Sequence, residues 1–355
     1  MKRVLEILVG GIGNTGISML VYNYCFYMNK ENIEIDFLSA NSVDIEFKNK
    51  FKKIGKVIEL PDRKKNLLLY IRKLKKILKN NDYDIVHIHG NSGTMGIESL
   101  ISKISGIKKI IVHSHNTECG HPVLNKILNP VMKKTANVYL SCSEAAGEWL
   151  FGKNNYTVLN NAINLEKFRY NEKIRNKYRQ DFNIKENIVI GHVGRINKQK
   201  NQEFLLDVFY EIHRRSKRTK LMLVGDGPLE QEIKEKIIKM DLENDVLMLG
   251  MREDANNVFQ AMDIFVFPSL FEGLGISLIE AQTSGLRCFA SDKIPAEANA
   301  TDTVLFYSLN LSKEIWAENI LNNINYVRKD NFELLKNTGF NIKNESEKLK
   351  KIYIK

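Results

Sequence analysis

The sequence is sparing in the features of secreted and membrane-spanning chains. Its 355 residues include only four cysteines, which lie far apart and form no Cys-x-x-Cys pair. Neither a disulfide framework nor a zinc knuckle is indicated, and a reducing cytoplasm fits. No apolar run approaches the roughly 18 residues that cross a bilayer. The start, MKRVLEILVGG, resembles a secretion signal, but Glu6 interrupts it and glycines follow, so it favours a first strand.

Acidic residues are outnumbered. The 53 lysines and arginines against 42 acidic residues give a formal net charge of +11. Such a charge suits an acidic partner, either a nucleotide, a nucleic acid or the anionic cytoplasmic face of a membrane. A general overuse of lysine explains it equally well, because the lysines are spread widely. The basic residues are not interleaved with aromatics in a recognisable module, so nucleic acid is not expected as a partner.

Short β-branched runs alternate with amphipathic segments along both halves of the chain. This alternation predicts βαβ units, mostly parallel sheets and, at this length, two α/β domains. In the first half we expect strands at 4–9, 33–38, 56–60, 85–88, 109–113, 138–141 and 157–159, and helices near 14–29, 66–79, 94–105 and 143–151. In the second half we expect strands at 188–193, 221–224, 246–249, 264–267, 287–290 and 304–306, and helices near 201–215, 229–240, 254–261 and 276–284. Between the two halves, after residue 164, a charged and irregular stretch is expected to about Glu186. From Lys313 to the end the sequence predicts helix, with a break at Gly339.

A glycine-rich turn, GGIGNTG, follows the first predicted strand. Gly11, Gly13 and Gly16 satisfy the G-x-G-x-x-G spacing of a dinucleotide-binding turn. Asp36 lies twenty residues after Gly16, where such an enzyme holds a ribose, so a nicotinamide-dependent oxidoreductase is a rival hypothesis. However, Phe37 continues the strand past Asp36, whereas a ribose-binding acid sits at a strand's end. A glycine turn also suits any protein that brings its backbone close to a phosphate.

Four histidines occur in two pairs at predicted strand ends. His87 and His89 lie in DIVHIHG, and His113 and His115 lie in IVHSHN. The histidine pairs could bind a metal ion, because imidazole is a common metal ligand, but no cysteine or carboxylate accompanies them in the sequence. For His87 we expect a hydrogen-bonded core histidine. His113 or His115 is expected to present an imidazole to a sugar hydroxyl or a developing charge.

The second half opens with a cationic strand–helix junction. Arg195 follows the predicted strand, and Lys200 precedes a helix that starts near Asn201. An arginine and a lysine beside a helix N-terminus form a phosphate-binding arrangement. The sequence Gly225-Asp226-Gly227 is a second tight turn that turn chemistry alone can explain.

The stretch FEGLGISLIEA places two carboxylates at a strand–turn–helix junction. Glu272 lies at the carboxyl end of a predicted strand, where an open α/β sheet binds ligands, and the turn that follows it exposes backbone N–H groups at Gly273 and Gly275. Carboxylates repel phosphate but accept hydrogen bonds from sugar hydroxyls. A purely structural role is an alternative for Glu280, because Ser277 and Glu280 have the spacing of a helix capping box.

These motifs, in this order, resemble the retaining glycosyltransferases of the two-domain GT-B type, family 4. Within that family they most resemble the branch that builds bacterial capsular and exopolysaccharides. The resemblance covers nearly the whole chain. It is carried by residues 10–16, 113–116, 161–164, 194–200, 225–228 and, above all, 271–281. A departure is Ala162, where the family commonly has glycine.

The resemblance implies a role for each matching residue. Arg195 and Lys200 would neutralise the donor diphosphate, and Glu272 would contact the transferred sugar. The backbone around Gly273, Leu274 and Gly275 would help to orient that sugar, and Glu280 would accept hydrogen bonds from the ribose. The turn at Gly11 to Gly13 would approach the diphosphate. The catalytic histidine would be His113 or His115, with His115 preferred.

The resemblance also implies an architecture and a reaction. Residues 1–165 would form a Rossmann-like acceptor-binding domain and 166–339 a Rossmann-like donor-binding domain, their parallel sheets facing a central cleft, with a helix at about 340–355 packing back on the first. The enzyme would transfer a hexose or N-acetylhexosamine with retention, from a UDP-linked donor to a lipid-linked cell-surface polysaccharide. It would need no cofactor and no metal. The site would be cytoplasmic, with peripheral contact at the anionic inner face of the membrane.

Two observations bear on these implications. The segment 63–79 is basic with an apolar stripe, which fits either a membrane surface or an ordinary core-packed helix. A non-catalytic nucleotide-sugar binder would carry the same motifs and remains, beside the oxidoreductase, an alternative. The sequence does not specify the donor sugar, acceptor, linkage or oligomeric state.

Overall fold

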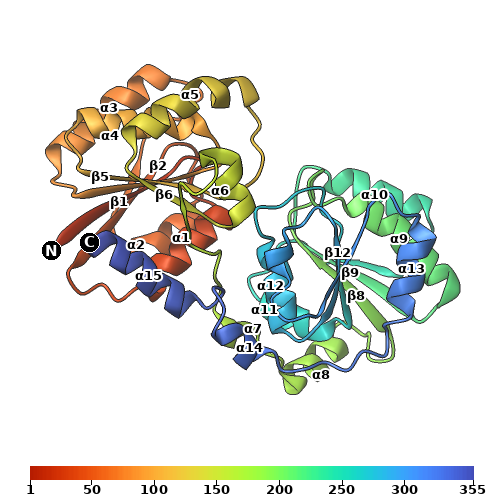
Figure 1. The fold of residues 1–355 in the computed structure, drawn as a ribbon. Coiled ribbons are helices and arrows are strands. Elements are labelled where there is room, and N and C mark those ends of the chain that lie inside the picture. Colours follow the sequence, from red (N-terminus) through yellow and green to blue (C-terminus); the bar gives the residue numbers. More distant parts are fainter. The chain divides into compact units, whose positions relative to one another are not determined.

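The chain folds into two compact units, seen in a computed structural model that describes all residues, 1–355 (Figure 1). Met1–Ile163 and Asn341–Lys355 form the N-terminal unit, and Asn164–Phe340 forms the C-terminal unit. The chain therefore leaves the first unit two residues earlier than the expected division after residue 165. Its last helix belongs to the first unit, so both chain ends lie there.

The N-terminal unit is built on a seven-stranded parallel sheet of strand order β3-β2-β1-β4-β5-β6-β7. Apolar, β-branched runs form its central strands, which are buried on both faces as parallel strands require. The strands are β1 (Lys2–Leu8), β2 (Ile33–Ser39), β3 (Val57–Glu59), β4 (Ile85–Gly90), β5 (Lys109–Ser114), β6 (Val138–Ser141) and β7 (Thr157–Val158).

Helices cover both faces of this sheet, and each face has its own apolar core. One face packs against α1 (Gly16–Tyr27), α2 (Ile45–Lys52) and α15 (Ile342–Ile354), and its core includes Phe37, Phe51 and Tyr353. The other packs against α3 (Leu67–Asn80), η1 (Gly93–Met95), α4 (Gly96–Ile104), α5 (Pro122–Thr135) and α6 (Glu144–Phe151). The last helix thus returns to the first domain, beside α1.

The C-terminal unit repeats the plan with a six-stranded parallel sheet of order β10-β9-β8-β11-β12-β13. Its strands are β8 (Ile188–Val193), β9 (Thr219–Val224), β10 (Val246–Met248), β11 (Ile264–Phe267), β12 (Arg287–Ser291) and β13 (Val304–Tyr307). One face is covered by α9 (Gln202–Arg215), α10 (Glu230–Lys239) and α13 (Lys313–Leu321), whose core centres on Trp316. The other elements are α7 (Leu165–Phe168), α8 (Glu172–Asp181), α11 (Ala255–Ala261), α12 (Ile276–Thr283), η2 (Ala296–Ala298) and α14 (Phe332–Lys336).

The two parallel α/β sheets confirm the predicted fold class, while four α-helices, α2, α5, α7 and α8, were not anticipated. Helix α5 carries Pro130 in its interior, which is a poor helix residue. Helix α8 falls in the stretch expected to be irregular; Asn171 caps it, and Arg175 and Arg179 bind Asp263. No helix combines the length and apolar character that crossing a membrane requires.

Candidate active site

Both sheets have the strand order of a Rossmann fold, in which successive strands are added in opposite directions from a switch point between the first and fourth strands. In such sheets ligands bind beside the carboxyl ends of the strands at that switch point. The reversal lies between β1 and β4 in the N-terminal unit and between β8 and β11 in the C-terminal unit. Arg195 follows β8 and Glu272 follows β11, so these two predicted residues flank one switch point.

In the C-terminal unit the structure joins two predicted residues directly. The Lys200 Nζ atom lies 2.7 Å from Glu272 Oε1, and both side chains are largely buried. The same ammonium lies 4.5 Å from the centre of the Phe267 ring, a cation–π distance. Lys200 is therefore held over the end of β11, with its charge shared between a carboxylate and an aromatic face.

Arg195 lies on the same edge but is exposed and makes no ion pair. Its backbone is fixed, because the Gln202 side chain donates to the Arg195 carbonyl at 3.0 Å. The turn at Gly225 to Gly227 packs against this segment. A Cβ atom on Gly225 would lie 2.1 Å from the Gly194 carbonyl oxygen, and one on Gly227 2.1 Å from that of Ile196. These glycines let two turns approach closely, which explains the motif beyond turn chemistry alone.

The turn after Glu272 presents backbone donors. Gly275 is the N-cap of α12 and has a φ of +86°, a conformation that favours glycine. The N–H groups of Gly273, Leu274 and Gly275 form no hydrogen bond within the chain. They stand at a helix N-terminus, where orphan donors and the helix dipole favour an electron-rich ligand.

The capping-box alternative for Glu280 is wrong. Because Gly275 is the N-cap, Ser277 lies inside the first turn of α12 and its side chain does not cap the helix. Glu280 is half-buried on the same helix. Burial raises its pKa to about 7, although Lys167 and Lys200 act in the opposite direction. A carboxyl group with a raised pKa and no capping role is a candidate for ligand binding.

In the N-terminal unit the glycine turn follows β1 as expected, but its N–H groups are engaged. Gly11 donates to Leu8, Ile12 to Ser42, and Gly13 to the Ser18 hydroxyl at 3.2 Å. Gly11 has a φ of +97°, and a Cβ there would lie 2.6 Å from the Ser42 carbonyl oxygen. The turn therefore offers close backbone approach more than free donors, which weakens the dinucleotide hypothesis.

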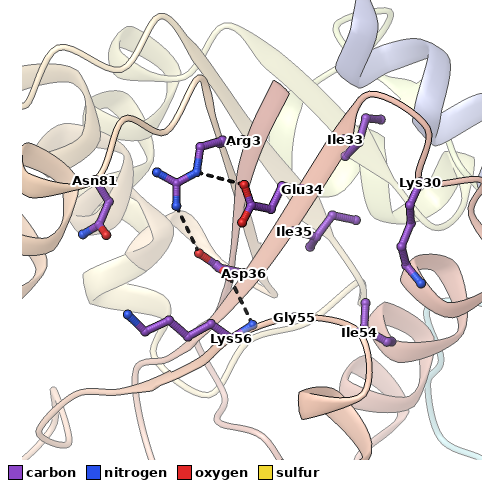
Figure 2. A pocket seen from close by; sticks show the side chains of 10 residues that line it. All are labelled: Arg3, Lys30, Ile33, Glu34, Ile35, Asp36, Ile54, Gly55, Lys56 and Asn81. Carbon is purple, nitrogen blue, oxygen red and sulfur yellow. Dashed lines mark hydrogen bonds and ion pairs between the residues drawn. The ribbon is translucent and has the colours of Figure 1, made fainter. Parts of the chain in front are cut away.

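Asp36 lies away from the switch-point edge. It is in the middle of β2, accepts a hydrogen bond from the Tyr83 hydroxyl at 2.7 Å, and lies 3.7 Å from the Arg3 guanidinium. Figure 2 shows it in a pocket beside the starts of β1 and β2, with the Lys56 backbone donating to it. No ribose-binding role fits this position. An Asp-x-Asp triplet that sequence reasoning overlooked, Asp82 to Asp84, lies near the same edge, where Asp84 binds the Arg3 backbone.

The four histidines gather on one face of the N-terminal sheet, under α1 and α15. His89 lies opposite His113 in the register of β4 and β5. The ring centres of His89 and His115 are 5.3 Å apart. Burial lowers the pKa of His89 to about 4 and holds those of His113 and His115 well below the usual value. The predicted core role of His87 fits the structure, since its Nδ1 lies 2.6 Å from the Tyr353 hydroxyl.

Sequence reasoning missed Glu6, the carboxylate that accompanies the histidines. Glu6 is fully buried in β1 and lies opposite His87 in the register of β1 and β4. Its Oε2 is 2.7 Å from His89 Nε2. Burial acts to raise the Glu6 pKa, but His87 and His89 outweigh it and hold the pKa well below its usual value. The available signal was one acid inside the apolar run VLEILV.

These groups also raise the question of a metal. His87, His89 and His113 bring ring nitrogens within 4.8 Å of one another. Both nitrogens of His89 already have partners, however, since Nδ1 lies 3.0 Å from His115 Nε2 and Nε2 contacts Glu6. The hydrogen-bond network accounts for this histidine without an ion, so we assign no metal here.

Comparison with known proteins places the chain in a family. The pattern described as Glycosyl transferases group 1 matches residues 187–324, and that of Glycosyltransferase Family 4 matches residues 14–167. The chain is 32% identical to EpsF of Bacillus subtilis (strain 168), a protein named as a glycosyltransferase, over 90% of this chain and 87% of EpsF. It is 26% identical to the capsular polysaccharide biosynthesis glycosyltransferase CapH of Staphylococcus aureus, over 87% of each chain.

Two further proteins extend the likeness. The UDP-Gal:alpha-D-GlcNAc-diphosphoundecaprenol alpha-1,3-galactosyltransferase of Escherichia coli is 27% identical, over 79% of this chain and 78% of its own. The crystal structure of Anabaena Alr3699/HepE in complex with UDP and glucose superposes with a TM-score of 0.83 at 16% identity, over 99% of each chain. This last likeness confirms the fold. The chain belongs to the family 4, group 1 glycosyltransferases, among relatives that include capsule-building enzymes.

Proposed function

We propose that this glycosyltransferase transfers a hexose or N-acetylhexosamine, with retention of configuration, from a UDP-linked donor to a lipid-linked cell-surface polysaccharide. The observation that carries the donor half is the Lys200–Glu272 pair at the switch point of the C-terminal sheet, 2.7 Å apart. At that switch point, a cation that can bind phosphate lies beside a carboxylate that can accept hydrogen bonds from sugar hydroxyls. The UDP and glucose bound by HepE, and the UDP-Gal used by the E. coli relative, support the choice of donor.

Each donor group has a matching residue. Arg195 and Lys200 neutralise the diphosphate and the leaving nucleotide, and Glu272 accepts hydrogen bonds from the transferred sugar. The N–H groups of Gly273 to Gly275 orient that sugar at the start of α12. Glu280, which has no capping role, accepts hydrogen bonds from the ribose. In retention the nucleotide departs and the acceptor attacks on the same face of the sugar.

The same charges support metal independence. The exposed Arg195 and the Lys200 ammonium supply positive charge where other transferases use a divalent cation. No cofactor is required beyond the nucleotide-sugar substrate. The N-terminal unit binds the acceptor, and His115 is its reactive imidazole in preference to His113. His115 follows β5 at the carboxyl edge, whereas His113 lies within the strand and stacks on His87 at 5.4 Å.

The acceptor places the reaction at the inner face of the membrane, and the surface of the N-terminal unit supports peripheral contact. Leu68 at the start of α3 is 74% exposed, and Val123 and Ile127 on α5 are 70% and 61% exposed. Helices α3 and α5 both pack on α4. Lysines flank both apolar groups, as in surfaces that enter the headgroup region of anionic bilayers.

One panel tests the proposal. Nucleotides and nucleotide sugars are screened for thermal stabilisation and for donor hydrolysis, with and without EDTA. We expect UDP-linked sugars to raise Tm and to be turned over equally in EDTA. Loss of turnover in EDTA would overturn metal independence, and indifference to every nucleotide sugar would overturn the donor assignment. Stabilisation without turnover favours the non-catalytic binder, and stabilisation by NAD(P) favours the oxidoreductase.

A further inference from the structure

We propose that Glu6 and His89 are positioning residues that hold His115 as its Nε2–H tautomer, leaving Nδ1 to accept a hydrogen bond from a substrate hydroxyl. The proposal rests on the proposed function, since it specifies what the N-terminal histidine does. It follows from counting protons along one chain of contacts, from β1 through β4 to the end of β5.

The chain starts at a buried carboxylate, Glu6, that accepts hydrogen bonds from a hydroxyl and a thiol and lies beside two imidazoles. The Tyr353 hydroxyl and the Cys25 thiol donate to Glu6 Oε1, the thiol from 3.8 Å. His87 Nδ1 and His89 Nε2 lie 3.2 and 2.7 Å from Oε2. Burial raises the pKa of both Tyr353 and Cys25 well above the usual values, so these groups keep their protons. Although burial acts to raise the Glu6 pKa, His87 and His89 hold it well below its usual value, so the carboxylate is ionised and can only accept.

The ionised carboxylate fixes the proton of His89. Because Glu6 Oε2 only accepts, His89 Nε2 must carry the hydrogen in their 2.7 Å contact. His89 is neutral at pH 7, since burial lowers its pKa to about 4. A neutral imidazole has one N–H, so His89 Nδ1 carries a lone pair.

That lone pair determines which ring nitrogen of His115 carries the proton. His89 Nδ1 lies 3.0 Å from His115 Nε2, so His115 Nε2 is the donor. His115 is also neutral, because burial holds its pKa well below the usual value. Its Nδ1 is therefore an acceptor. This buried atom forms no hydrogen bond of normal geometry in the chain, although the Asn161 side chain lies beside the ring.

The opposite arrangement fails at the carboxylate. If His115 carried its proton on Nδ1, His89 Nδ1 would have to donate and His89 Nε2 would become an acceptor. Two acceptors would then face each other across 2.7 Å inside the core. Such a buried mismatch costs a few kcal/mol, so the tautomers of both histidines are coupled to the charge of Glu6.

The consequence is a chemical preference at the site. An Nδ1 lone pair receives a hydrogen bond from a hydroxyl and cannot donate to a phosphate oxygen. The group opposite His115 is therefore a hydroxyl of the donor sugar or of the acceptor. Because Tyr353 donates to Glu6, the last helix of the chain also supports the network.

The tautomer can be read without turnover. Long-range ¹H–¹⁵N spectra of the full-length chain, labelled at histidine, distinguish Nδ1–H, Nε2–H and charged imidazoles. The His115 signals are identified by their loss in His115→Gln. We expect neutral Nε2–H forms for His89 and His115 at pH 7. A neutral Nδ1–H form of His115, or a charged one, overturns the proposal.

Variants connect the tautomer to catalysis. Glu6→Met removes the acceptor, and His89→Phe removes the link while keeping a planar ring. In each we expect a mixture of His115 tautomers and a fall in kcat of about 10- to 100-fold, with donor KM changed less than about threefold. The double variant should be no worse than either single variant, because both interrupt one chain of contacts.

A matched control separates positioning from packing. His213 is a buried histidine in the C-terminal unit, 3.4 Å from Asp245, and His213→Phe should leave kcat within about twofold. Wild-type kcat in folded Glu6→Met and His89→Phe overturns the proposal. If the wild-type enzyme hydrolyses no nucleotide sugar, the proposed function fails, while the spectra still decide the tautomer. If the variants do not fold, the wild-type spectra decide alone.

Discussion

At the residue scale, the Lys200–Glu272 contact makes two site residues depend on each other before any donor binds. The lysine offsets a carboxylate whose side chain is only 9% exposed. We expect Lys200→Met to lower the free energy of unfolding of the C-terminal unit by about 1–3 kcal/mol, because a largely buried charge loses its partner. Transfer should be lost, since the diphosphate loses its cation. Denaturant unfolding and a donor-transfer assay measure the two effects.

A second ion pair in the same unit provides the control. Lys220 lies 2.9 Å from Asp245, and both side chains are about one-fifth exposed. Lys220→Met should lower stability similarly and leave kcat/KM within about twofold. If Lys200→Met kept full transfer while destabilising the unit, Lys200 would be a structural residue only.

The raised pKa of Glu280 predicts a pH dependence with a definite sign. Its folded-state pKa is about 7, above the ordinary value of 4.5, so the folded chain binds the extra proton between these values. The stabilisation is complete below pH 4.5 and is lost as pH rises through 7. Relative to Glu280→Gln, the wild type should lose about 1 kcal/mol across this window, after allowance for solvent screening. Thermal unfolding between pH 4.5 and 8 measures it.

UDP binding should show the opposite trend. A ribose hydroxyl donates better to the ionised carboxylate, so UDP affinity should rise as pH passes from 6 to 8. Titration calorimetry should find that Glu280→Gln loses this rise. A variant that kept the full pH dependence would assign it to another group.

At the scale of elements, the approach of two turns supports the Arg195 segment. A Cβ on Gly227 would meet the Ile196 carbonyl oxygen at 2.1 Å, so Gly227→Ala must displace the backbone after Arg195. We expect a loss of about 1–3 kcal/mol in stability and at least tenfold weaker UDP binding. Gly120→Ala is the control, because nothing lies within 4 Å of its added methyl group. Normal UDP binding by folded Gly227→Ala would show that this contact does not position the site.

The last helix contributes through one hydroxyl. Tyr353 donates to Glu6 and contacts His87, so Tyr353→Phe leaves a buried carboxylate short of one donor. We expect a loss of about 1–3 kcal/mol by denaturant unfolding. Tyr326→Phe is the matched control, because the buried Tyr326 hydroxyl has no partner, and it should be neutral or slightly stabilising. Equal effects of the two variants would argue against a special role for Tyr353.

The elements also show what sequence reasoning could reach. Buried parallel strands are continuous apolar runs, so β6, β8 and β11 fall at their expected bounds. Helix α8 was missed because its low apolar content hides a helix that tertiary contacts stabilise: Arg175 and Arg179 bind Asp263, more than 80 residues away. Glu6 was missed for the same reason, since its partners at His89 and Tyr353 are brought to it only by the fold. Local motifs put Lys200 and Glu272 beside neighbouring strand ends, where the structure brings the two side chains into contact, and their roles in donor binding stay predictions.

For the whole molecule, the net charge of +11 suggests a particular membrane-facing surface once the exposed apolar side chains are considered with it. Leu68, Val123 and Ile127 are exposed on helices that both pack on α4, among lysines, so we expect electrostatic attraction and apolar insertion to act together there. We expect the protein to co-sediment with vesicles containing an anionic lipid, and much less with zwitterionic vesicles. High salt should weaken the binding, because it screens the lysines.

The double variant Leu68→Ser/Ile127→Ser should lower the partition coefficient by about tenfold, since two apolar side chains no longer leave water. Val327 on the C-terminal unit is 78% exposed, and Val327→Ser provides a control of similar apolar loss that should bind normally. Activity on a soluble acceptor analogue should be unchanged in both variants, because none of these residues lies at a switch point. Equal binding of the double variant and Val327→Ser would reduce the membrane interaction to charge alone. A lower partition coefficient confined to the double variant would identify this surface as the side that approaches a lipid-linked acceptor.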